Sequence, residues 1–259
     1  MAATASIYSA LSARAYAQQS WPELGFHDRA ARLLAKLLGV NTPVNNDPLW
    51  ERSCLVRSQL FDVRCRQFFK LHPQGMCIDL GAGLSTRFHR LSEADDWPRF
   101  SWVDVDLPDI TAIKTNAFPK IDNYQLIAAN IVQDDWLAAI GWHPHTPLII
   151  TLESVLSDMS VTDIYTVFAN IAKHCTAASQ IEIVFDYPNP EPRWYEFFVY
   201  RKRTFVLRNL VNDIASLGLV LTHRESIKTK ADSKLTAGTG QIDGLFVCSI
   251  AASYAPYFK

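Results

Sequence analysis

The spacing of hydrophobic residues changes near residue 55, which separates a helical beginning of the chain from a mixed α/β remainder. Over the first forty residues, apolar positions such as Ile7 and Leu11 recur at helical intervals. Breaks at Trp21-Pro22 and at Gly25 interrupt this pattern. We therefore expect the N-terminal residues to be helical before and after these breaks.

A connector rich in turn residues, Asn41–Pro48, follows these helices, and an amphipathic pattern then predicts a helix over Leu55–Leu71. The connector does not mark a domain boundary, because the piece before it is too small to bury a hydrophobic core of its own. We expect one domain over residues 1–259, in which residues 1–50 form a helical cap.

Short apolar runs alternate with longer segments from residue 76 onward, and this alternation predicts a parallel sheet with helices on both faces. The runs are Met76–Leu80, Phe100–Leu107, Tyr124–Ile131, Leu148–Leu156 and Ile181–Tyr187. Two later runs, Leu219–Ile227 and Gly244–Ser253, have no clear helix between them and predict an antiparallel hairpin at the sheet edge. The expected architecture is a seven-stranded, mostly parallel α/β sheet.

Composition narrows the class of protein further. Hydrophobic residues make up 49% of the chain, which is ordinary for a globular protein. The 25 basic and 26 acidic residues give a net charge of -1, so there is no overall field to hold nucleic acid. No apolar run is long enough to cross a membrane, and the first residues do not resemble a signal peptide. The five cysteines lack paired spacing, which indicates reduced thiols in a cytoplasmic protein without a structural metal.

The sharpest local signal is the segment CIDLGAGLSTRF, residues 77–88. Gly81 and Gly83 directly after an apolar run permit a tight turn and a close approach of the backbone to a ligand. A dinucleotide fingerprint requires a third glycine or alanine, and Thr86 stands at that position. A nucleoside without a pyrophosphate, such as S-adenosylmethionine, requires less of this turn. The alternative is a strand-to-helix turn that binds no ligand.

An acidic residue at the end of the next run would complete a nucleoside site, because a carboxylate accepts hydrogen bonds from ribose hydroxyls. Both Asp104 and Asp106 stand there, and they share one face of a strand, so spacing alone does not choose between them. The alternative role for such an acid is to cap a helix. Together with the strand pattern, the acid makes nucleoside binding the favoured interpretation.

Several segments in order resemble the leucine carboxyl methyltransferase family, and within it the bacterial polyketide O-methyltransferases of the tetracenomycin type. The segments are ALSARAYAQQS, HDRAARLL, LVRSQLFDVRCRQFF, HPQGMCIDLGAGLSTRFHRL, WVDVDLPDI, IAAN and TLESVL, between about residues 8 and 190. The resemblance implies a class I S-adenosylmethionine-dependent methyltransferase fold, which is Rossmann-like. It also implies methyl transfer to an oxygen of a small molecule in secondary metabolism.

The resemblance also implies cofactor contacts for residues that match the family pattern. It places Arg57 at the methionine carboxylate of S-adenosylmethionine, Gly81 and Gly83 under the methionine end, Asp106 at the ribose, Asn130 and Ile131 beside the adenine, and Glu153 near the amino group. Arg14 matches loosely, as a charge at the mouth of the pocket. Asn130 departs from an acid that is common in the family, and Ser154 follows Glu153 where the family has Gly or Cys.

The acceptor side is less specific. Residues 187–217 combine aromatic and basic side chains, which favours a lid for a flat, anionic small molecule; an amphipathic helix with its basic face in water is the alternative. No residue is marked as a general base, and His143 and His145 are interpreted as loop residues. A carboxylate acceptor requires no base, so it is favoured over a phenol. The pattern implies neither a metal nor an oligomeric state.

Two other functions remain open at this point. A nicotinamide-dependent oxidoreductase shares the glycine turn but requires the third glycine that Thr86 replaces. A regulatory or scaffold protein that binds the cofactor without catalysis would keep the same binding residues. Binding of NAD would support the first, and cofactor binding without turnover would support the second.

Overall fold

The computed structural model describes residues 2–40, 47–92, 100–174, 180–188, 214–226 and 245–252. The chain divides into two compact units, Met1–Ala129 and Asn130–Lys259. Residues 189–213, which include most of the segment predicted to form a lid, lie outside the described residues.

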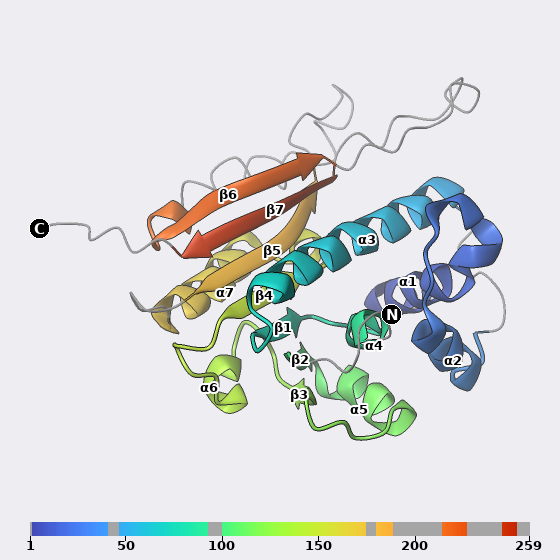
Figure 1. Cartoon of the computed structure of the whole chain (residues 1–259), viewed down its shortest axis with the longest axis horizontal. Coiled ribbons are helices and arrows are strands. Elements are labelled where there is room, and N and C mark those ends of the chain that lie inside the picture. The colour runs from blue at the N-terminus through green and yellow to red at the C-terminus, as the bar shows by residue number, and fades with distance from the viewer. Residues whose placement is uncertain are drawn as a thin grey trace, which may run out of the picture. The chain divides into compact units, whose positions relative to one another are not determined.

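The first unit holds a parallel sheet and the N-terminal helices (Figure 1). Its helices are α1 (Ala2–Ser20), η1 (Pro22–Leu24), α2 (Arg29–Leu37), α3 (Pro48–Leu71), α4 (Arg87–Ser92) and α5 (Pro108–Ala117), and its strands are β1 (Met76–Leu80), β2 (Ser101–Asp106) and β3 (Tyr124–Ala128). The strands run parallel in the order β3-β2-β1. Ile78 pairs with Val103, and Val103 pairs with Gln125. Because the strands are parallel, the carboxyl ends of β1 and β2 lie at the same edge.

The second unit combines parallel and antiparallel pairing. Its strands are β4 (Leu148–Leu152), β5 (Ile181–Pro188), β6 (Leu219–Ser226) and β7 (Leu245–Ala252), and its helices are α6 (Trp136–Ile140), η2 (Leu156–Asp158) and α7 (Val161–His174). The strand β4 runs parallel to β5, and β7 lies antiparallel between β5 and β6 (Figure 1). Parallel strands alternating with helices, and a late antiparallel pair, agree with the α/β pattern of the sequence.

The helix α3 begins seven residues earlier than the amphipathic pattern predicted, at Pro48 instead of Leu55. Asp47 causes the difference, because its carboxylate accepts hydrogen bonds from the backbone N–H groups of Leu49 and Trp50 at 3.0 and 3.2 Å. Proline at the first helical position is compatible with this start, since that N–H has no partner within the helix. The expected connector therefore ends in a helix cap.

The N-terminal helices share a hydrophobic core with the rest of the first unit. Leu11 and Leu34, from α1 and α2, pack with Leu84, which follows the glycine turn. Ala13 and Ala17 of α1 pack in a second cluster with Leu55 of α3. Of residues 1–50, predicted to form a helical cap, α1 and α2 therefore contact the segment that follows the glycine turn.

Three described cysteines, Cys54, Cys65 and Cys77, are buried thiols that take part in no disulfide. Burial raises the pKa of the Cys77 thiol well above its usual value, and the neighbouring Cys65 adds to the effect. Within the described ranges, no helix combines the length and the apolar character needed to cross a bilayer.

Candidate cofactor site

The turn after β1 has the backbone conformation that its two glycines allow. Gly81 and Gly83 have φ angles of 64° and 53°, in the left-handed region that residues with a β-carbon rarely adopt. The N–H of Gly81 donates to the carbonyl oxygen of Val105 at 2.8 Å, which ties the turn to the end of β2. The next helix, α4, begins only at Arg87, so residues 81–86 form an open loop at the carboxyl edge of the strands.

Asp106, the last residue of β2, closes this loop from the other side. One carboxylate oxygen accepts from the N–H of Gly83 at 2.6 Å, and the other accepts from the N–H of Leu107 at 2.7 Å. Burial raises the pKa of Asp106, while these two hydrogen bonds oppose the effect. A carboxylate has about four lone-pair positions, so each oxygen can accept a further hydrogen bond. The structure therefore brings Gly81, Gly83 and Asp106 together at the carboxyl ends of β1 and β2.

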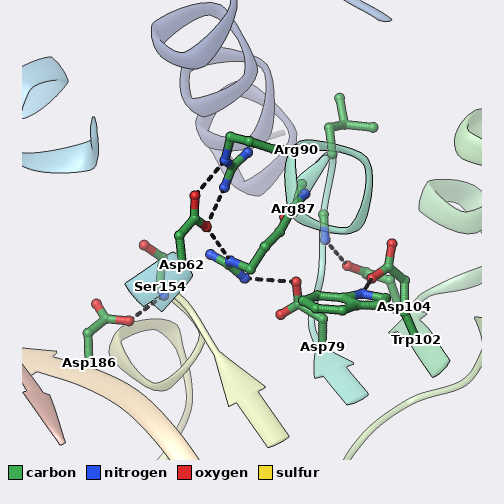
Figure 2. Close-up of polar contacts among 12 residues, drawn as sticks. Asp62, Asp79, Arg87, Arg90, Trp102, Asp104, Ser154 and Asp186 are labelled. Carbon is green, nitrogen blue, oxygen red and sulfur yellow. Dashed lines mark hydrogen bonds and ion pairs between the residues drawn. The ribbon is translucent and has the colours of Figure 1, made fainter. Parts of the chain in front are cut away.

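Asp104 is excluded from a ligand role by its own contacts. Its carboxylate accepts from the indole N–H of Trp102 at 2.8 Å (Figure 2). It also accepts from the Lys114 ammonium at 2.6 Å and from the Tyr124 hydroxyl at 2.5 Å. The side chain is 4% exposed. Asp104 is thus a buried structural group, and of the two acids that share a strand face, only Asp106 is available at the loop.

A buried ionic network fixes the helix that follows the glycine loop. Arg87 of α4 is 1% exposed and donates to Asp62 of α3 at 3.1 Å and to Asp79 of β1 at 3.0 Å (Figure 2). Its guanidinium also lies over the ring of Phe61 at 5.2 Å. Asp79 is two residues before Gly81, so these contacts link the strand of the glycine turn to α3.

Arg90 extends this network to the start of α2. It donates to both oxygens of Asp62, at 2.7 and 2.8 Å, and to Asp28 at 2.5 Å. Burial opposes the charge on Arg90, but the carboxylates of Asp62 and Asp28 outweigh it and raise the pKa. The hydroxyl of Thr86 also donates to Asp28, at 2.7 Å. The residue that replaces the third glycine of a dinucleotide motif therefore serves to anchor α2.

The two candidate arginines differ in their surroundings. Arg57 is half-buried on α3, five residues before Asp62. Arg14 of α1 is 6% exposed and donates to the carbonyl oxygen of Leu84 at 3.1 Å. Its Nε is buried without a hydrogen-bond partner in the described part of the protein. A buried cation with an unused donor beside the glycine loop is well suited to binding an anion.

Asn130 and Ile131 belong to the second unit and lie past the end of β3, not within the predicted strand Tyr124–Ile131. The N–H of Asn130 donates to Asp134 at 2.6 Å, and its side-chain oxygen accepts from the N–H of Val132 at 3.0 Å. These local hydrogen bonds form a turn and stop the strand. Both residues are half-buried, so the structure assigns Asn130 a turn-forming role in addition to any contact with a ligand.

Glu153 is half-buried and stands directly after β4, which ends at Leu152 and not at the predicted Leu156. The strand ends because Ser154 has a φ of 62°, which an extended chain cannot contain. The N–H of Ser154 donates to the buried carboxylate of Asp186 at 2.6 Å (Figure 2). This places Glu153 at the carboxyl end of the parallel strand β4.

Sequence reasoning missed the carboxylates that hold these turns. Asp186 interrupts the apolar run Ile181–Tyr187, and the rule that marked Glu153, a carboxylate inside an apolar run, applies to it equally. Arg87 and Arg90 carry no such signal, because arginines three residues apart on a short helix are ordinarily exposed.

His143 and His145 lie in a turn with their rings 5.1 Å apart. Among the residues that the structure describes, no three or more His, Cys, Asp or Glu side chains are arranged so that they could bind a metal ion.

Comparison with known proteins agrees with this geometry. The tetracenomycin polyketide synthesis O-methyltransferase TcmP of Streptomyces glaucescens is 25% identical over 118 residues, which are 46% of this chain and 42% of that protein. The match therefore spans less than half the length of this curated relative. A structure from Thermobifida fusca, provisionally described as a methyltransferase, has a TM-score of 0.59 at 16% identity and covers 93% of this chain and 94% of its own. LepI in complex with SAM has a TM-score of 0.51 at 15% identity, over 89% of this chain and 56% of that chain.

The structural likenesses, at identities this low, establish a shared methyltransferase fold and no more. The sequence comparison goes further, because the profile of the leucine carboxyl methyltransferase family matches residues 8–172, which is more than half of the 259 residues. The matched range includes the N-terminal helices, the glycine turn and the end of β4. The chain therefore belongs to the leucine carboxyl methyltransferase family.

Proposed function

We propose that the protein is an S-adenosylmethionine-dependent O-methyltransferase that methylates a carboxylate of a small molecule in secondary metabolism. The observation that carries the proposal is the junction of β1 and β2, where Asp106 holds the left-handed glycine turn and keeps accepting positions for two ribose hydroxyls. Membership of the family supports the same activity. Methylation of a phenolic hydroxyl is the second candidate reaction, because the tetracenomycin relative is named as an O-methyltransferase.

The residues of the first unit are assigned to the sugar and the amino-acid tail of the cofactor. Asp106 accepts from the ribose, and Gly81 and Gly83 let the methionine end pass close to the backbone. Arg57 and Arg14 bind the methionine carboxylate, because a guanidinium donates two parallel, charge-assisted hydrogen bonds to it. The unused donor of Arg14 supports this assignment.

The residues of the second unit are assigned to the base and the amino group. Asn130 and Ile131 contact the adenine, with the Asn130 side-chain oxygen retaining one lone pair beside its bond from Val132. Glu153, half-buried at the end of β4, contacts the cofactor's ammonium group through a charge-assisted hydrogen bond. The acceptor is a flat, anionic molecule, an assignment that rests on the aromatic and basic sequence of residues 187–217.

The cofactor supplies a methyl group on a positively charged sulfur. In the reaction a bond forms between the acceptor oxygen and the methyl carbon as the sulfur–methyl bond breaks. The protein's task is to hold the oxygen in line with that bond, which lowers the entropic part of the barrier. A carboxylate is already ionised near neutral pH, so no general base is needed. Three buried cysteines in the thiol form support a reducing, cytoplasmic location.

Titration calorimetry tests the binding step. The proposal expects heat of association with S-adenosylmethionine and S-adenosylhomocysteine and none with NAD. Absence of binding to both sulfur nucleosides would overturn it, and binding of NAD alone would favour the oxidoreductase.

Turnover tests the chemical step with a panel of aromatic carboxylates and the matching phenols. Methyl ester formation on carboxylates alone supports the first candidate, and transfer to phenols alone supports the second. Cofactor binding without transfer to any acceptor would favour a regulatory or scaffold protein.

A further inference from the structure

Ser154 is in a backbone conformation that its residue type disfavours. Its φ of 62° makes it the only non-glycine residue with a positive φ among those that the structure describes. A β-carbon in this region crowds the neighbouring carbonyl oxygen, so the conformation persists only where the surroundings enforce it. Ser154 is exposed, so packing of its side chain does not supply that enforcement.

The contact that enforces it comes from Asp186 on the neighbouring strand. Leu152 at the end of β4 pairs with Phe185 on β5, and Asp186 is the next residue along β5. Its side chain is 4% exposed and accepts the N–H of Ser154 at 2.6 Å (Figure 2). A hydrogen bond to a carboxylate is about twice as strong as one between neutral groups. The bond takes the Ser154 N–H out of the strand ladder and stabilises the left-handed turn.

The turn sets the direction of the Glu153 side chain, because Glu153 lies between the last residue of β4 and Ser154. If Ser154 relaxed to an extended conformation, β4 would continue and Glu153 would become an interior strand residue. Its side chain would then follow the alternation of the strand instead of the direction set by the turn. The geometry therefore couples the direction of one carboxylate to the hydrogen bond of another.

We propose that Asp186 is a positioning residue that holds Ser154 in the left-handed conformation and thereby aims Glu153 at the amino group of the cofactor. This inference rests on the proposed function and adds a residue to it. Serine in place of glycine makes the turn depend on Asp186, because glycine would adopt the same φ without help. Asp186 itself touches neither cofactor nor acceptor in this scheme.

The test compares two probes by titration calorimetry. S-adenosylhomocysteine carries the amino group that Glu153 binds, whereas 5′-methylthioadenosine lacks the amino-acid tail. For Asp186→Ala we expect affinity for S-adenosylhomocysteine to fall roughly tenfold or more, the scale of one hydrogen bond to a charged group. Affinity for 5′-methylthioadenosine stays within about twofold, because the sugar and base contacts are unchanged.

Glycine rescue separates positioning from a general structural role. In the double variant Ser154→Gly with Asp186→Ala, affinity for S-adenosylhomocysteine recovers to within about threefold of the wild type, since glycine needs no enforcement. Ser154→Val gives the opposite result without removing a buried group: a β-branched residue opposes positive φ and selectively weakens S-adenosylhomocysteine binding. This variant keeps the test decisive if Asp186→Ala does not fold.

Asp163→Ala is the matched control, because this carboxylate also bonds locally, to the Ser160 hydroxyl at 2.7 Å, but lies at the start of α7. Both probes bind this variant as they bind the wild type. Equal loss of both probes without glycine rescue overturns the inference, and so does equal affinity of Ser154→Val and Ser154→Gly for S-adenosylhomocysteine. A wild-type protein that binds neither probe overturns the proposed function itself, which is a distinct result.

Discussion

At the scale of single residues, the proposed function assigns the binding of the ribose to the carboxylate of Asp106. Replacing it with Asn removes the charge while keeping the shape, so the ribose loses its charged acceptor. Hydrogen bonds to charged groups contribute about 1.5–3 kcal/mol. We expect Asp106→Asn to weaken S-adenosylhomocysteine binding by roughly one to two orders of magnitude, measured by calorimetry. An unchanged affinity would contradict the ribose assignment.

The pH dependence of binding provides a second test of Asp106. Burial raises its pKa. In the proposed function the ribose hydroxyls donate to this carboxylate, and its ionised form is the better acceptor. Affinity is therefore complete at neutral pH and is lost as the pH falls through the raised pKa, at a higher pH than for an exposed aspartate. Calorimetry across this range should show the loss in the wild type and a flatter profile in Asp106→Asn.

At single residues, prediction from sequence succeeded where the residue type and its place next to a strand point to the same role. It failed where contacts with residues far along the chain decide the role. The glycine pair and a nearby acid were recognisable from local pattern. Spacing alone did not choose Asp106 over Asp104, and only the family resemblance did; the physical reason is that Trp102, Lys114 and Tyr124 converge on Asp104. Tyr124 is twenty residues away in the chain, on another strand, and no local pattern predicts such a contact.

At the scale of elements, Asp62 joins α3 to α4 through two arginines. Removing one partner of a buried ion pair leaves an uncompensated charge, which costs about 3–5 kcal/mol. We expect Asp62→Asn to lower the free energy of unfolding by about that amount in denaturant titrations. As a control, Lys173→Gln removes a largely exposed ion pair with Asp135 and should leave stability nearly unchanged. Equal effects of the two variants would contradict a buried network.

His89 of α4 links stability to pH through its packing between helix and sheet. Its ring stacks on Phe118 at 4.3 Å, and burial followed by the charge of Lys114 lowers its pKa to about 4, against smaller opposing effects of Asp104 and Asp28. The unfolded state binds the proton first as the pH falls. The contribution of His89 to stability is therefore complete above about pH 6.5 and is lost towards pH 4.

We expect His89→Phe to flatten the dependence of unfolding free energy on pH between these values. Denaturant titrations at several pH values measure it, with the Lys173→Gln variant as the reference of unchanged slope. A slope identical to that of the wild type would show that His89 is not held neutral.

Element boundaries were predictable to different degrees for physical reasons. The strand β1 matched its predicted range because Pro73 and Gly75 precede it and Gly81 follows it. The helix α3 was placed too late, since Asp47-Pro48 looks like a loop until the carboxylate is seen to cap the helix. The strand β4 was placed too long, because a serine with positive φ leaves no sign in the sequence.

At the scale of the whole molecule, ligand binding should raise thermal stability by mass action. Ligand at about 100 times its dissociation constant stabilises the native state by about 2.7 kcal/mol. For a protein of this size the melting temperature should then rise by roughly 5–10 °C with S-adenosylhomocysteine. NAD at the same concentration should give no shift in the same thermal scan. A shift with NAD alone would instead support the oxidoreductase.

The buried ion pairs of Arg87 and Arg90 also constrain the order in which the first unit can fold during synthesis. Asp28, Asp62 and Asp79 leave the ribosome before Arg87 and Arg90, which neutralise them. Until the arginines emerge, three carboxylates facing an apolar interior keep their hydration and hold that interior open. Arrival of α4 is therefore the event that lets the earlier helices close over β1, and a nascent chain lacking it should remain sensitive to proteases.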